Sequence, residues 1–99
     1  MGTPLLFVQM KQNNPNSVKV YVAVSDVNNV GIEKVCYKTG SASSAEDVIS
    51  TGTEISLDSD CYYSFDVTTN GYYYFAAKLS DNTIIKWNSS QSISGIITN

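Results

Sequence analysis

Four valines alternate with other residues between Val18 and Val24, so one face of this segment is apolar while Lys19, Tyr21 and Ala23 occupy the other. Alternation with a period of two and a high density of β-branched residues are typical of a half-buried β-strand. The same pattern runs through residues 63–67 and 73–79. Weaker strand candidates are residues 5–10, 32–38, 54–57, 83–87 and 92–97.

Clusters of Asn, Asp, Gly and Ser separate these segments at intervals of roughly 8–12 residues, as turn-forming residues do between short strands. Seven or eight short strands with this spacing indicate an all-β sandwich or barrel. Only residues 44–49 could form a helical turn, with Ser43 or Ser44 as its cap and Glu46 and Asp47 in its first turn.

Composition narrows the classes of function. The chain has 99 residues, a formal net charge of −3, no histidine and no arginine. Lack of histidine removes imidazole bases and the usual Ser–His and Cys–His pairs, and an acidic chain without arginine is a poor nucleic-acid binder. No segment approaches the roughly 20 apolar residues of a membrane span. We therefore expect no enzyme, no catalytic residue, no metal or cofactor, no nucleic-acid partner and no direct membrane insertion.

Two segments carry a family resemblance: Val30–Gly40, with the letters VGIEKVCYKTG, and Tyr63–Lys78, with YSFDVTTNGYYYFAAK. Together they resemble bacterial immunoglobulin-like domains, which occur in surface and secreted proteins. The resemblance covers roughly residues 18–97 and departs from the family pattern at Leu79, where an aspartate is usual. It implies an all-β fold, an immunoglobulin-like β-sandwich of about seven strands in two antiparallel sheets. We expect one domain over residues 4–97, with residues 1–3 a linker or expression start and 98–99 a tail.

The resemblance also implies how the core is held. Asn70-Gly71 would mark the corner where the chain crosses between sheets, and Tyr73 would be the corner tyrosine whose hydroxyl bonds back to the backbone. Phe75 stands where antibody domains have a cysteine, so packing rather than an inter-sheet disulfide would hold the core. The expected core is Val18, Val20, Val22, Val24, Val35, Tyr37, Phe65, Val67, Tyr73, Phe75 and Ala77.

Cys36 and Cys61 allow two interpretations. Alternation that points Val35 and Tyr37 inward would point Cys36 outward, so a bridge to Cys61 would have to form around a sheet edge. Such a disulfide would stabilise an exported protein by about 2–4 kcal/mol. The alternative is two separate small apolar side chains, which are common in β-domains.

Acidic residues cluster at two predicted turns. Asp58, Asp60 and Asp81 could supply oxygen ligands to calcium, which takes six to eight of them, or could simply form turns by bonding their own backbone. Turn formation is the expected role, because no EF-hand pattern is present. A glycosidase carboxylate pair is not expected, since nothing in the sequence places these residues around a cleft.

Tyr72 and Tyr74 would project from the face opposite Tyr73 and Phe75, and Trp87 on the next strand could join them. Exposed aromatic rings on a sheet can stack sugar rings or anchor a protein contact. They can also be ordinary strand formers that pair across strands, with Trp87 covering one end of the core.

The function predicted from these patterns is a non-catalytic immunoglobulin-like module of a larger bacterial surface or secreted protein, extracellular or at the cell surface. It would act as a spacer or an adhesion domain. Its partners would be neighbouring domains, a polysaccharide or a host or cell-surface protein. The alternatives are a carbohydrate-binding module that uses Tyr72, Tyr74 and Trp87, and an accessory domain packed on a catalytic neighbour.

Overall fold

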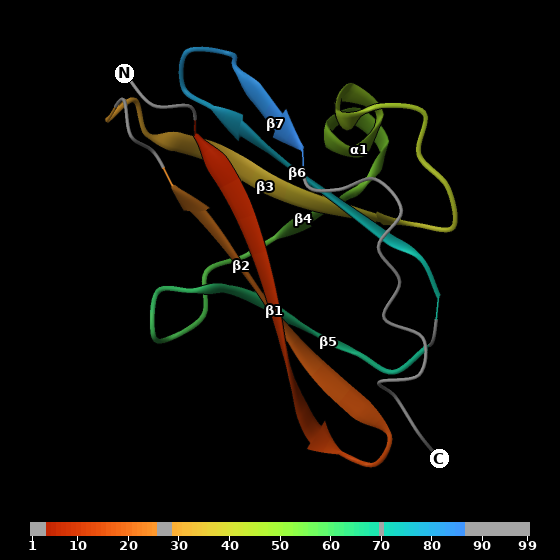
Figure 1. Ribbon diagram of the computed structural model, residues 1–99. Helices are drawn as coiled ribbons and strands as arrows, with labels where there is room; N and C mark the ends of the chain where they lie inside the picture. Colours follow the sequence, from red (N-terminus) through yellow and green to blue (C-terminus); the bar gives the residue numbers. More distant parts are fainter. Residues whose placement is uncertain (1–3, 26–28, 70, 87–99) are drawn as a thin grey trace.

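Seven strands form two antiparallel sheets in the computed structural model, which describes residues 4–25, 29–69 and 71–86 (Figure 1). This confirms the predicted β-sandwich. The first sheet has the order β1-β2-β5, with β1 (Leu5–Asn14), β2 (Ser17–Ser25) and β5 (Tyr63–Val67). The second has the order β4-β3-β6-β7, with β4 (Thr53–Ile55), β3 (Ile32–Thr39), β6 (Tyr73–Leu79) and β7 (Ile84–Lys86).

The alternating valines place β2 at the centre of the first sheet. Val18, Val20 and Val22 are at most 2% exposed, and their neighbours Lys19 and Tyr21 point to the outer face. β1 pairs with β2 from Leu5 to Asn14, with an irregularity between Gln12 and Asn14. Paired side chains of the two strands therefore lie on the same face of the sheet. Because a shift of one residue would exchange the two faces, the valine pattern fixes this register.

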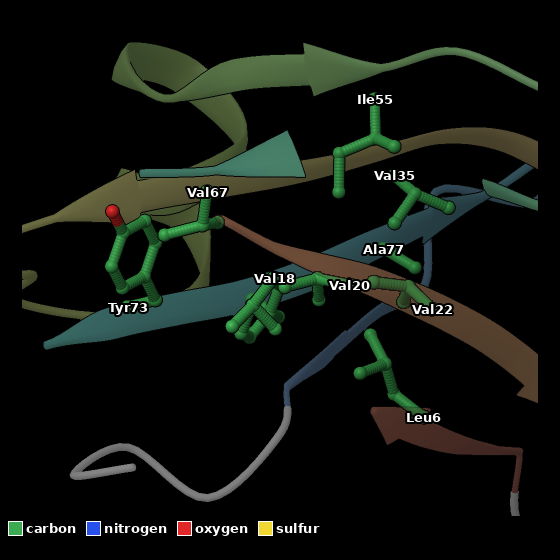
Figure 2. Packing of buried hydrophobic residues seen from close by; sticks show 10 residues of the cluster. Leu6, Val18, Val20, Val22, Val35, Ile55, Val67, Tyr73 and Ala77 are labelled. Atoms are coloured by element: carbon green, nitrogen blue, oxygen red, sulfur yellow. The ribbon is translucent and has the colours of Figure 1, made fainter. Parts of the chain in front are cut away.

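Side chains from both sheets meet in one core, and Figure 2 shows most of them facing one another across the sandwich. The Tyr37 ring stacks on the Phe65 ring with centroids 4.2 Å apart, so β3 of the second sheet packs against β5 of the first. Most of the expected core is confirmed, but Val24, Tyr37 and Phe65 are only partly buried. The core also contains Leu6 and Ile55, which come from segments that the sequence marked as weaker strands.

The corner between β5 and β6 behaves as the resemblance implies. β5 lies in the first sheet and β6 in the second, so the chain crosses between the sheets here. The Tyr73 hydroxyl donates a hydrogen bond of 2.9 Å to the backbone carbonyl of Thr69. Burial of this phenol, with a smaller effect of Tyr37, raises the pKa of Tyr73. The hydroxyl therefore stays protonated and remains a donor.

The fourth strand departs from the constant immunoglobulin arrangement, in which it joins the sheet of the first, second and fifth strands. Here β4 pairs with β3 instead, with Ile55 opposite Val35 and Thr53 opposite Tyr37. A short helix, α1 (Ala45–Thr51), lies between β3 and β4 and returns the chain beside β3.

The helix confirms the predicted helical turn and extends two residues past its expected end at Ile49. The Ser44 hydroxyl caps it by accepting a hydrogen bond of 3.0 Å from the Asp47 backbone N–H. Val48 and Ile49 pack against Cys36 in a second apolar cluster. The helix therefore partly covers the outer face of the second sheet, the face on which the sequence placed Tyr74.

Candidate functional site

The predicted aromatic site does not form an open platform in the described residues. Tyr72 is 54% exposed, but Tyr74 is half-buried because it packs against the cluster beneath α1. The packing of Tyr74 against this cluster places its side chain on the outer side of the second sheet, as predicted. Trp87 lies outside the described residues. The structure thus leaves Tyr72 as the one exposed ring of this set among the residues it describes.

The two cysteines are free thiols, so the structure contains no bridge between them. Cys36 does point away from the core of the sandwich, as its alternation with Val35 predicts, but α1 covers it and leaves it 1% exposed. Burial raises the pKa of the Cys36 thiol, so it is less reactive than a free cysteine. Cys61 is exposed and has a positive φ of 66° in the turn before β5.

Asp58 serves as a turn former. Its Oδ1 accepts hydrogen bonds from the backbone N–H groups of Asp60 and Tyr62 at 2.8 and 3.0 Å, and its Oδ2 accepts one from the Ser64 hydroxyl at 2.7 Å. These bonds, the one from Tyr62 first, hold the pKa of Asp58 below its ordinary value. Asp81 likewise accepts a hydrogen bond of 3.0 Å from the Thr83 N–H. Within the described ranges, no three His, Cys, Asp or Glu residues gather as a metal ion would require.

A shallow depression lies on the outer face of the first sheet. It has a volume of about 510 Å³ and is lined by residues of β1, β2 and the turn before β5; we call it the aromatic hollow. Its lining residues are Phe7, Gln9, Tyr21, Val22, Ala23 and Tyr62.

Strand register accounts for the shape of the aromatic hollow. Phe7 lies opposite Ala23, and Gln9 lies opposite Tyr21, so a small methyl group sits beside two aromatic rings. The Tyr62 ring meets the Tyr21 ring edge to face, with centroids 6.0 Å apart and planes at 86°. Large side chains around a small one leave a depression between them. Phe7 is 49% exposed and Tyr62 57% exposed, so both rings remain available to a ligand.

The turn holds Tyr62 in place although this residue lies outside any strand. Its backbone N–H donates to the Asp58 carboxylate, and its carbonyl accepts a hydrogen bond of 2.7 Å from the Asp58 N–H. The ring is further fixed by its contact with Tyr21. A half-exposed aromatic side chain with a fixed backbone loses little conformational freedom when a ligand arrives, which favours binding.

The aromatic hollow itself carries no formal charge, and the charged residues of the same face lie farther along the strands. Lys19 lies opposite Asp66 in the register of β2 and β5, and Lys11 lies opposite Lys19 on β1. Among the described residues, the structure gives no hydrogen-bond partner to the Gln9 amide. The site therefore combines aromatic surface with neutral hydrogen-bonding groups, a combination that suits non-covalent binding.

Sequence reasoning placed Tyr21 on an outward face but identified neither Phe7 nor Tyr62 as a candidate contact. One available signal was the run Leu5–Val8, which is apolar on both faces of its strand and therefore supplies an exposed ring as well as core residues. No pattern connected Phe7 with Tyr62, because they meet only through β1, β2 and the turn before β5.

No family model, curated protein or solved structure matches this chain. The resemblance to bacterial immunoglobulin-like domains therefore rests on the residues quoted for it. In the parts of the chain that the structure describes, no helix has both the length and the apolar character to cross a membrane.

Proposed function

We propose that this chain is a non-catalytic immunoglobulin-like module of a larger bacterial surface or secreted protein, and that it acts as an interaction domain. The aromatic hollow is the observation that carries the proposal. A module that served only as a spacer would have no need for half-exposed aromatic rings held in place on the outer face of a sheet. Single exposed apolar residues are ordinary on soluble domains, whereas apolar side chains gathered in one place mark interaction sites, and here three aromatic rings line one depression.

Two further features support a binding role rather than catalysis. The chain has no histidine, and the carboxylate of Asp58, whose pKa is lowered, is occupied by hydrogen bonds within its own turn and from Ser64. The resemblance of residues 18–97 to bacterial immunoglobulin-like domains supplies the expected setting, outside the cell and beside neighbouring domains.

Retention on immobilised surfaces tests the proposal. The domain, fused to a fluorescent protein, is applied to bacterial cell walls, to insoluble polysaccharides and to immobilised host matrix proteins, with the fluorescent protein alone as blank. Tyr62→Ser removes a ring of the aromatic hollow, and Tyr72→Ser is the matched control, since Tyr72 is exposed to a similar degree on the other sheet.

We expect retention on at least one class of surface, with a loss of about tenfold in affinity for Tyr62→Ser, as for truncation of a contact residue worth more than 1 kcal/mol. Tyr72→Ser should bind as the wild type does. Absence of retention on every surface, or equal retention by the Tyr62→Ser variant, would overturn the proposal.

A further inference from the structure

We infer that the aromatic hollow binds a short neutral oligosaccharide, with the rings of Phe7 and Tyr62 against the apolar C–H faces of the sugar and the Gln9 amide bonded to its hydroxyls. This inference rests on the proposed function and specifies its ligand. It assigns sugar binding to the first sheet, whereas the sequence suggested Tyr72, Tyr74 and Trp87.

Size favours a small ligand over a protein. The aromatic hollow measures about 510 Å³, which lies within the range of roughly 300–1,000 Å³ typical of ligand sites. A stable protein interface buries roughly 800 Å² and 20–30 residues on each side. Here the exposed apolar side chains of β1 on this face are Leu5 and Phe7, and charged residues such as Lys11 and Lys19 follow on the same face. A protein partner would have to cover those charges as well.

Charge favours a neutral ligand. No acidic or basic residue lines the aromatic hollow, so an ionised ligand would find no opposite charge within it. The lining residues whose side chains carry polar groups are Gln9, Tyr21 and Tyr62. Amides and phenols both donate and accept hydrogen bonds, and sugar hydroxyls do the same.

The open shape distinguishes a sugar from an apolar molecule. The aromatic hollow lies on the face of a sheet, so a ligand there keeps one side in water. An apolar molecule would leave that side unfavourably hydrated, since apolar surface gains free energy only where it leaves water. A sugar ring can place one C–H face on the aromatic rings while its hydroxyls remain solvated.

Isothermal titration of the whole chain tests this assignment. The probes are cellohexaose, laminarihexaose, maltohexaose, xylohexaose and mannohexaose, with a charged galacturonate hexamer as the contrast. Phe7→Ser, Tyr62→Ser and Gln9→Ala alter the aromatic hollow, and Tyr72→Ser is the control. The urea midpoint of each variant is measured, so that a loss of binding is not confused with unfolding.

At least one neutral hexamer should bind, with a Kd at least about tenfold higher for Phe7→Ser and for Tyr62→Ser and an unchanged Kd for Tyr72→Ser. The galacturonate hexamer should bind more weakly. Failure of every neutral hexamer to bind, or an equal loss in Tyr72→Ser, overturns the sugar assignment. If the domain still shows Tyr62-dependent retention on matrix proteins, the interaction module stands and only the sugar is wrong.

Discussion

Gly52 should tolerate no side chain, although its backbone is extended rather than left-handed. It follows α1 and precedes β4, and its N–H donates a hydrogen bond of 2.9 Å to the Val48 carbonyl. A Cβ at this position would lie within 3.0 Å of two carbonyl oxygens, those of Val48 and Tyr37, where ordinary contact requires at least 3.4 Å. Gly52→Ala therefore forces the backbone carbonyl groups of Val48 in α1 and Tyr37 in β3 away from residue 52.

The loss of stability in Gly52→Ala follows from the backbone groups that the added methyl displaces. Overpacking typically costs about 1–3 kcal/mol, and weakening of the Gly52–Val48 hydrogen bond adds about 0.5–1.5 kcal/mol. We therefore expect Gly52→Ala to lower the free energy of unfolding by about 1.5–4.5 kcal/mol. In a domain of this size the corresponding fall in Tm is about 6–36 °C. Because α1 covers Cys36, displacement of the helix should also expose that thiol.

Urea unfolding and thiol reactivity measure the two effects independently. Gly71→Ala is the control, since the nearest atom to its added Cβ would be the Tyr73 ring at 3.9 Å, an ordinary contact. Gly52→Ala should unfold at lower urea and show two reactive thiols in the native state, whereas Gly71→Ala should match the wild type. A Gly52→Ala protein as stable as the wild type, with Cys36 still protected, would refute the packing of α1 described here.

Three further predictions follow from single contacts. Tyr73→Phe removes the hydrogen bond to Thr69 and should cost about 0.5–1.5 kcal/mol in urea unfolding; no change would mean that the corner bond contributes nothing. In the native state, protein that has not been reduced should show one reactive thiol, that of Cys61. In the denatured state it should show two, and fewer than two reactive thiols in that state would indicate a disulfide. The Lys38 ammonium at 2.8 Å, with the Ser43 N–H and the Thr51 hydroxyl, lowers the pKa of Asp47 from 3.8 to about 2. Ionised Asp47 therefore stabilises the fold above about pH 4, and this contribution is lost as the pH falls towards 2. Asp47→Asn should be less stable than the wild type at pH 7 and close to it at pH 2, and a difference unchanged by pH would contradict the ion pair.

Local rules predicted much of the fold. The valines of β2 recur at every second residue, a period that fits a strand and not a helix. Ser44 followed by Asp47 provides a helix cap with an acidic first turn. The corner tyrosine was also predicted correctly, because Tyr73 occupies a position that the family pattern fixes. Each of these features depends on residues that are close together in the sequence.

Features that depend on long-range packing could not be predicted in this way. Alternation placed Cys36 on the outer side of its sheet, but it could not indicate that α1 would cover that side. For the same reason the sequence suggested an exposed Tyr74. The aromatic hollow joins Phe7 and Tyr62, which are far apart in the chain, and the pairing of both β1 and β5 with β2 brings them to one place.

An NMR titration of backbone amides against the neutral hexamers tests the assignment of the outer face of the first sheet as the binding surface of this domain. We expect the largest shift changes at Phe7, Tyr21 and Tyr62, and no change at Tyr72. Largest changes at Tyr72 and Tyr74, on the second sheet, or no change with any hexamer, would contradict it.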